Sequence, residues 1–304
     1  MAIIPDECKF HVVSESVDTV DRGSKLAQSK RESITMADIK QSIPTPVGIF
    51  ERSTGECSIV PVVGNNIVET KCGTISGGYN NYILQTGTEQ SYGSDVISGG
   101  SNNQINSSYA TGGNVVSGGY YNTIKNEYTG GNGCLYNNTI GGGKCNCIST
   151  DSSYSVYNTI VGGHYNYVRG EAYGNSIAGS GNSVCAYNGI TDVEIGRTYA
   201  NNITGNDNRI EVGRCDGGVA GSNGIFGSEN LIGVCGDDAC SCYNTISGYG
   251  NAIRVKGGAG APNSNCEANV CYSIVSGYGN YIKSESSDVY YSSINNTFMK
   301  NAKQ

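Results

Sequence analysis

The sequence predicts an all-β fold, a parallel β-roll or β-solenoid built from stacked repeats. Three observations predict it: a short motif that recurs ten times, an apolar content that is mostly Ile and Val, and 45 glycines, about twice the usual share of roughly 7 %. Ile and Val are stiff at the first side-chain torsion and favour strands. Leu occurs only four times and Trp never, so a core made of helices is nearly excluded.

The repeat unit begins with Ile or Val, has Gly at its third position, and closes with an Asn, any residue, and Ile or Val. The ten copies are Ile75–Ile83, Ile97–Ile105, Val116–Ile124, Ile140–Ile148, Ile160–Val168, Ile177–Val184, Ile203–Ile210, Ile225–Ile232, Ile246–Ile253 and Val275–Ile282. The first five copies have nine residues and the last five have eight. A constant motif with connections of varying length is typical of a solenoid.

Two positions of the motif never vary. The third residue is always glycine: Gly77, Gly99, Gly118, Gly142, Gly162, Gly179, Gly205, Gly227, Gly248 and Gly277. The residue two places before the closing Ile or Val is always asparagine: Asn81, Asn103, Asn122, Asn146, Asn166, Asn182, Asn208, Asn230, Asn251 and Asn280. Glycine permits positive φ and close backbone approach, and stacked asparagines can bond from layer to layer. We expect both sets to be structural.

A second asparagine often lies two residues before the opening Ile, as in Asn138–Ile140 and Asn244–Ile246. Each unit thus holds two Asn-x-Ile segments, which predict two short strands per coil. The stretches between copies, such as Ser149–Thr159 and Cys185–Asn202, are rich in Tyr, Ser, Gly and Asn. We expect them to be loops that carry interaction surface, because a stack fixes the backbone while its loops tolerate change.

The expected core is thin. Each coil offers about two inward apolar side chains for some 22 ordered residues, and each ordered residue costs about 1 to 2 kcal/mol of conformational entropy. Three chains that pack these columns together would close a common core, so we expect a homotrimer. With strands about 4.8 Å apart, ten coils predict a rod on the order of 50 Å long.

The chain divides into three predicted parts. Residues 1–70 lack the repeat and are expected to form an N-terminal attachment or cap domain. Residues 71–283 hold the ten copies, and residues 284–304 are expected to form a degenerate coil or cap at the end of the stack.

Within the N-terminal part, Phe10–Val13 is predicted to be a strand. A short helix is expected to begin at Ser33 or Thr35, since both residues are good helix caps. The segment Val47–Val68 alternates apolar and polar residues, as strands do.

Composition excludes several classes of protein. Only 15 % of residues are charged, the net charge is −7, and no dense Lys/Arg cluster occurs, so no nucleic-acid partner is expected. No run of about 18 apolar residues predicts insertion into a membrane. The start of the chain lacks the features of a secretory signal, so we expect synthesis in the host cytoplasm.

No catalytic residue, cofactor or metal is predicted. His164 occupies a repeat position that is Tyr, Ser or Lys in other copies, and His11 has no partner evident in the sequence. Asp207 and the Asp237–Asp238 pair resemble ligands of calcium-binding β-rolls, but the nonapeptide of that class does not recur.

The thirteen cysteines are expected to be mostly buried free thiols, which we favour over a disulfide framework because disulfides seldom persist in a cytosol. Of the three roles considered for these cysteines, metal binding is the least favoured, after free thiols and disulfides.

Three motif segments carry a resemblance to known families. Asn244–Ile253 reads N-T-I-S-G-Y-G-N-A-I, Ile75–Ile83 reads I-S-G-G-Y-N-N-Y-I, and Asn158–Val168 reads N-T-I-V-G-G-H-Y-N-Y-V. They resemble the head repeats of trimeric YadA-like adhesins and related repeats of phage and viral fibres. The resemblance spans about residues 72–283 and implies a trimeric, left-handed parallel β-roll with adhesive function. The units here are longer and less regular, and the sequence shows no signal peptide and no membrane-anchoring barrel. Those differences favour a virion protein over a surface autotransporter.

We therefore expect a tailed-phage fibre that is both a structural rod and a host-receptor adhesin. It would bind other virion proteins through residues 1–70 and a host surface glycan or protein through its loops. The receptor-binding candidates are Tyr92, Tyr109, Tyr128, Tyr154, Tyr173, Tyr187 and Tyr199, because aromatic faces stack on sugar rings. The same tyrosines could instead fill clefts between chains.

Two other functions stay open at this point. One is a purely structural spacer or decoration of a capsid or tail, with no receptor. The other is a glycan depolymerase, since such tailspikes are also parallel β structures that use a pair of carboxylates. Asp192 and Glu194 are the candidate pair.

Overall fold

In the computed structural model of the chain, the described residues are 10–11, 33–34, 50–85, 93–107, 110–126, 134–150, 154–186, 197–212, 219–234, 240–255, 269–271, 273–284, 289–290 and 293–295. The chain divides into two units, Met1–Ile49 and Phe50–Gln304. Over the described residues, no helix has the length and apolar character needed to cross a membrane.

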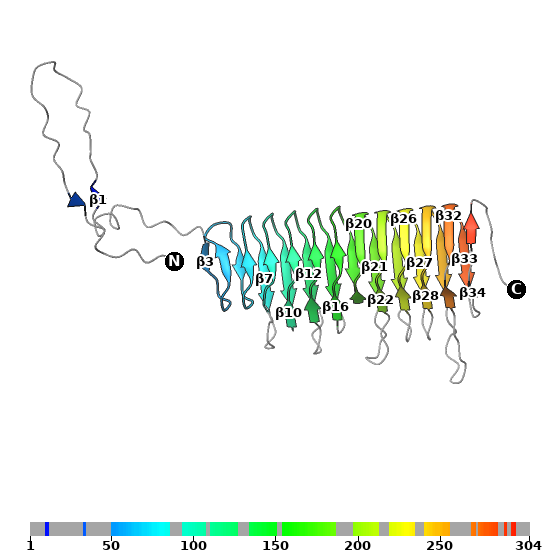
Figure 1. The fold of residues 1–304 in the computed structure, drawn as a ribbon, viewed down its shortest axis with the longest axis horizontal. Coiled ribbons are helices and arrows are strands. Elements are labelled where there is room, and N and C mark those ends of the chain that lie inside the picture. Colours follow the sequence, from blue (N-terminus) through cyan, green and yellow to red (C-terminus); the bar gives the residue numbers. More distant parts are fainter. Residues whose placement is uncertain are drawn as a thin grey trace, which may run out of the picture. The chain divides into compact units, whose positions relative to one another are not determined.

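The second unit is a β-solenoid whose strands stack coil upon coil into three sheets (Figure 1). The first sheet contains, in spatial order, β3 (Phe50–Arg52), β4 (Ile59–Pro61), β6 (Thr74–Ile75), β8 (Val96–Ile97), β11 (Val115–Val116), β14 (Thr139–Ile140), β17 (Thr159–Ile160), β20 (Ser176–Ser180), β23 (Asn202–Asn206), β26 (Gly224–Ser228), β29 (Thr245–Tyr249), β32 (Ile274–Tyr278) and β35 (Ser293–Asn295).

The second sheet contains β5 (Ile67–Val68), β7 (Tyr82–Gln85), β9 (Gln104–Ser107), β12 (Thr123–Asn126), β15 (Cys147–Thr150), β18 (Tyr167–Arg169), β21 (Ser183–Ala186), β24 (Arg209–Val212), β27 (Leu231–Val234), β30 (Ala252–Val255) and β33 (Tyr281–Ser284). The third sheet contains β10 (Ala110–Gly112), β13 (Cys134–Tyr136), β16 (Tyr154–Val156), β19 (Glu171–Tyr173), β22 (Arg197–Tyr199), β25 (Val219–Gly221), β28 (Cys240–Cys242), β31 (Asn269–Cys271) and β34 (Val289–Tyr290).

Successive coils pair in parallel, with the repeat in register. The opening Ile of each motif lies in the first sheet and the closing Ile or Val in the second, so that Ile140 pairs with Ile160 and Ile148 pairs with Val168. Each motif therefore turns one corner of the coil. The prediction of an all-β, parallel β-solenoid is confirmed.

The prediction of two strands per coil is wrong for the coils from β10 onward, which have three. The third strand lies in stretches that the sequence predicted to be loops; β16, for example, falls within residues 149–159. Its inward side chain is Thr111, Leu135, Ser155 or Ala172 in the first four coils that have it, and all four are fully buried. Because that position changes between polar and apolar residues, the sequence shows no repeating hydrophobic signal for this strand.

The stack begins before the boundary at residue 70 that the sequence suggested. β3 and β4 form an antiparallel pair, β4 then pairs in parallel with β6, and β5 pairs with β7. The hairpin covers the free edge that β4 would otherwise present. At the other end β34 and β35 continue the third and first sheets, in the part where a degenerate coil was predicted.

In the first unit, β1 (Phe10–His11) pairs antiparallel with β2 (Ser33–Ile34). The strand predicted at Phe10–Val13 is thus present over its first two residues. The helix predicted to begin at Ser33 is wrong at that position, because the backbone of Ser33 pairs with that of His11. The alternative start at Thr35 lies outside the described residues.

The core of the solenoid is closed within a single chain. Ile140 and Ile148 are both 0 % exposed, and the same holds for most members of the two Ile/Val columns. Burying each such side chain contributes roughly 1.5 to 3 kcal/mol. The thin core that led us to expect a homotrimer is supplemented, in the coils from β10 onward, by the third strand and by two columns of asparagine. The thin core therefore no longer argues for a trimer. The trimer stays a prediction, and the outer face of the first sheet is the feature that supports it.

Candidate functional site

The asparagines of the motif form a continuous ladder inside the solenoid. The backbone N–H and the side-chain Nδ2 of Asn166 both donate to Oδ1 of Asn146, at 3.0 and 3.1 Å. The same Nδ2 donates to the carbonyl oxygens of Gly162 and Gly179, at 2.8 and 2.6 Å. All ten motif asparagines are at most 1 % exposed. They satisfy backbone groups at a buried corner and are closed to any ligand.

The crowded contact expected at the third-position glycines falls one residue later in the nine-residue copies. A Cβ on Gly162 would have no neighbour within 4 Å, whereas one on Gly163, at φ 85°, would collide with the carbonyl oxygen of Gly179. In the eight-residue copies the third-position glycine takes the crowded place, as Gly179 does against the carbonyl oxygen of Gly205. The extra residue of the longer copies therefore precedes the crowded glycine.

A second ladder, which the sequence did not predict, lies at the corner between the third and first sheets. Its rungs are Asp95, Asn114, Asn138, Asn158, Asn175, Asn201, Asn223, Asn244 and Ser273, each at most 1 % exposed. The pattern of asparagine two residues before the opening Ile was the signal that could have revealed it.

Asp95 is the first rung of this second ladder. One carboxylate oxygen, Oδ1, accepts the backbone N–H and the Nδ2 of Asn114, both at 2.9 Å, and Oδ2 accepts the hydroxyl of Thr111 at 2.9 Å. Burial raises the pKa of Asp95 to about 6, although these three hydrogen bonds act in the opposite direction. Asp95 is fully buried and its partners lie on or beside the next rung of the ladder, so we assign it a structural role.

Three of the seven candidate tyrosines are described, and all three lie on the third sheet. The rings of Tyr173 and Tyr199 are stacked, with centroids 5.3 Å apart and planes 16° apart. Tyr154 is 41 % exposed at the start of β16. The structure thus brings together Tyr173 and Tyr199, which are 26 residues apart in sequence. The other four candidates, Tyr92, Tyr109, Tyr128 and Tyr187, lie outside the described residues.

An ion pair between a buried glutamate and a half-exposed arginine lies beside the stacked rings. Glu171 is 3 % exposed, and its Oε1 accepts the hydroxyl of Tyr173 at 2.7 Å and Nε of Arg197 at 2.8 Å. Its other oxygen, Oε2, has no hydrogen-bond partner. The pKa of the Tyr173 phenol is raised, first by burial and then by the bond to Glu171, while the charge of Glu171 raises the pKa of Arg197. Both tyrosine and arginine therefore keep their protons.

Sequence reasoning missed Glu171 and Arg197. In E-A-Y and R-T-Y the charged residue and the tyrosine are separated by one position, which places them on the same side of a strand. The register pairs Glu171 with Arg197 and Tyr173 with Tyr199. Because these segments were predicted to be loops, the alternation was not read as strand.

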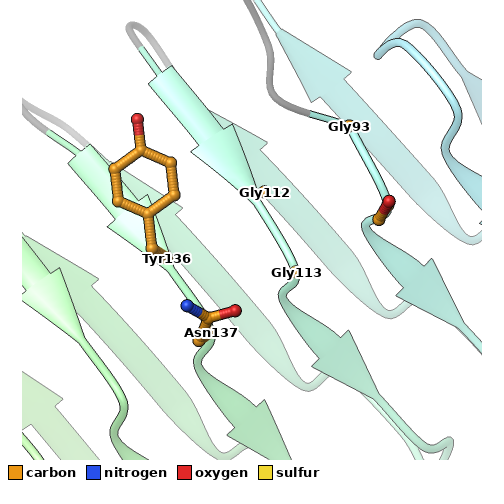
Figure 2. Close-up of a pocket in the computed structure, with 6 residues that line it drawn as sticks. Gly93, Gly112, Gly113, Tyr136 and Asn137 are labelled. Atoms are coloured by element: carbon orange, nitrogen blue, oxygen red, sulfur yellow. The ribbon is translucent and has the colours of Figure 1, made fainter.

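A groove opens on the same sheet, several strands away (Figure 2). It has a volume of about 520 Å³ and is lined by Gly93, Ser94, Gly112, Gly113, Tyr136 and Asn137. Gly93 bridges to Gly112, and Gly112 pairs with Tyr136, so the three lie in one column. Both glycines line the groove without a side chain, and a Cβ on Gly93 would collide with the backbone carbonyl of Lys71.

Two of the remaining polar candidates, His164 and Asp207, lie in the described residues. Nδ1 of His164 lies 3.2 Å from Oγ of Ser180, and Asp207 adopts a left-handed corner conformation with its carboxylate against Gly181. In this part of the chain, no group of three His, Cys, Asp or Glu side chains is placed to hold a metal ion. Asp192, Glu194, Asp237 and Asp238 lie outside it. Three cysteines, Cys57, Cys72 and Cys145, are free thiols.

Comparison of the chain with models of known protein families, with curated proteins and with solved structures gave no match. The features available for a functional proposal are therefore the third sheet with its tyrosines, its Glu171–Arg197 pair and its groove.

Proposed function

We propose that this protein is an adhesive fibre protein of a tailed-phage virion, in which the solenoid is the structural scaffold and the third sheet binds a glycan or protein on the host surface. The observation that carries the proposal is the Tyr173–Tyr199 stack, with the Glu171–Arg197 pair beside it. Residues 1–70 would attach the chain to other virion proteins.

A ladder-bonded solenoid suits this role. Each coil is fixed to its neighbours by strand pairing and by two columns of buried asparagine, so side chains on the outer surface are held in place before a ligand arrives. Preorganised aromatic side chains lose little entropy on binding and offer large contact area. Tyrosine adds a hydroxyl for polar contacts, which suits both sugars and proteins.

The proposal is tested by adsorption of the purified full chain to bacterial cells and to a panel of their surface polysaccharides. The Tyr173→Ala/Tyr199→Ala double variant should lose binding. Tyr249 and Tyr278 provide a matched control, because they form a second stacked pair, 5.5 Å apart, in the first sheet. Because these two tyrosines lie on the first sheet, sedimentation must first show that their double alanine variant keeps the oligomeric state of the parent; it should then bind as the parent does.

Three results would contradict this proposal. Absence of binding to every surface would favour the purely structural spacer. Equal loss in both double variants would indicate a general structural effect. Release of reducing sugar from a bound polysaccharide would favour the depolymerase alternative, since an adhesin leaves its ligand intact.

We also propose that the chain self-associates as a homotrimer through the outer face of the first sheet. No strand of that sheet from β6 to β32 contains a charged residue. Val161, Phe226 and Ile274, which are 59 %, 44 % and 53 % exposed, project from or beside its strands. Uncharged faces with exposed apolar side chains are typical of protein interfaces.

Sedimentation of the full chain tests the trimer. The expected mass is three times the chain mass of 31.8 kDa. Phe226→Lys should shift the protein toward the monomer, because an unpaired charge would be buried at the interface. A monomer at all concentrations, or a trimer unaffected by the lysine, would contradict the proposed interface.

A further inference from the structure

The groove beside Tyr136 is lined by glycine at two successive positions of one column of the third sheet. Along the third sheet the column runs Gly93, Gly112, Tyr136, Val156, Tyr173 and Tyr199. The groove extends across neighbouring coils, from Gly93 past Gly112 to the Tyr136 side chain. Figure 2 shows the ring of Tyr136 projecting beside the strand that carries Gly112 and Gly113. The volume of the groove, about 520 Å³, lies within the range of roughly 300 to 1,000 Å³ common for ligand sites.

The described lining is aromatic and polar, with no charged side chain. One wall is the Tyr136 ring, and the polar groups are the hydroxyl of Ser94, the amide of Asn137 and the peptide groups of the glycines. Asn137 is held in a left-handed conformation, at φ 54°, which fixes the start of its side chain at the rim. In the described strands of this sheet, the charged residues Glu171 and Arg197 belong to later coils. Lys71, whose backbone lies beside Gly93, is paired with Glu56 at 3.1 Å.

We propose that this groove is a subsite for an uncharged pyranose unit of a glycan, a proposal that rests on the adhesive function above and names its ligand class. The C–H face of a pyranose would stack on the Tyr136 ring, and its hydroxyls would exchange hydrogen bonds with Ser94, Asn137 and the glycine backbone. An acidic sugar would lose the solvation of its carboxylate and meet no cationic side chain in the described lining, and the Lys71 ammonium is already paired with Glu56, so the groove should favour a neutral sugar.

The test fills the groove without touching its polar groups. Gly112→Val introduces the residue that the same column carries at Val156, so a strand of this sheet accommodates it. Gly221→Val is the matched control, because Gly221 lies in the same column beyond Tyr199 and outside the groove. Tyr136→Ala, which removes the wall, and Tyr136→Phe, which keeps the ring, form a second pair.

The full chain would be titrated with the methyl glycosides of glucose, galactose, mannose and N-acetylglucosamine, and with methyl glucuronide, followed by calorimetry or ligand-observed NMR. At least one neutral glycoside should bind, and Gly112→Val and Tyr136→Ala should each weaken it by about tenfold or more. Gly221→Val and Tyr136→Phe should bind within about twofold of the parent. Circular dichroism confirms that each variant is folded.

The subsite is overturned if no neutral glycoside binds, if Gly112→Val binds as the parent does, or if the glucuronide binds most tightly. Adsorption to bacterial cells is measured on the same variants. Adsorption that depends on Tyr173 and Tyr199 but not on the groove would leave the adhesive function standing without the subsite. Glycoside binding in the groove without adsorption to any surface would contradict the adhesive function and keep the subsite.

Discussion

Asp95 begins the second ladder at a position where the following coils carry asparagine. Its carboxylate accepts the same two donors from Asn114 that an asparagine oxygen accepts on later rungs. It differs in being ionisable, and burial raises its pKa from 3.8 to about 6. The folded chain therefore binds this proton more tightly than the unfolded chain does.

The sign of the pH effect follows from that shift. Stability contributed by the Asp95 proton is fully present below about pH 3.8 and is lost as the pH rises through about 6. Above that range the charged form costs on the order of 3 kcal/mol. Asp95→Asn should therefore be more stable than the parent at pH 8 and close to it at pH 3.5. Urea unfolding at both pH values checks this, and an equal difference at the two would contradict it.

At the scale of the element, the corner between the first and second sheets is set by backbone crowding. Gly163 lies where the next coil's carbonyl oxygen, that of Gly179, leaves no space for a Cβ, and its positive φ adds strain for any other residue. Gly162, one residue earlier, has open space around it and a φ outside the left-handed region. The position of Gly163 therefore requires glycine and that of Gly162 does not, although the third position of the motif is glycine in all ten copies.

Alanine at each position gives opposite predictions. Gly162→Ala should be neutral or stabilise the fold by up to about 1 kcal/mol, because it reduces the entropy of the unfolded chain. Gly163→Ala should destabilise it by more than about 2 kcal/mol, since the backbone of two coils must separate. Thermal unfolding of the two variants side by side measures the difference, and equal effects would contradict the assignment of the crowded glycine.

At the scale of the whole molecule, each coil contacts its two neighbours, and stability should approximate a sum over coils. Residues 224–244 make up one complete coil, and their removal joins Asn223 to Thr245 with both ladders still in phase. The shortened chain should fold with an unchanged circular dichroism shape and a melting temperature only a few degrees lower. Removing residues 225–244 instead leaves one extra residue, which turns the inward Ile246 outward. That variant should lose cooperative unfolding, and equal behaviour of the two deletions would contradict a register-locked stack.

Much of the scaffold was predictable from the sequence, because its determinants repeat. The Ile/Val columns, the motif asparagines and the parallel stacking of coils follow from short motifs read one copy at a time, and the structure confirms the β-solenoid. The crowded glycine was misplaced by one residue in the longer copies, since the sequence does not show which of two adjacent glycines faces the next backbone.

Only the tertiary structure decided the third strand and the surface on it. Glu171 and Arg197, like Gly112 and Tyr136, become neighbours because connections of different lengths return the chain to the same sheet in register. No local pattern encodes such a pairing, as the inward residue of the third strand varies from Thr to Leu to Ala. The sequence by itself determined the coil, through residues that repeat. The candidate binding surface depends on residues that do not repeat and that only stacking brings together.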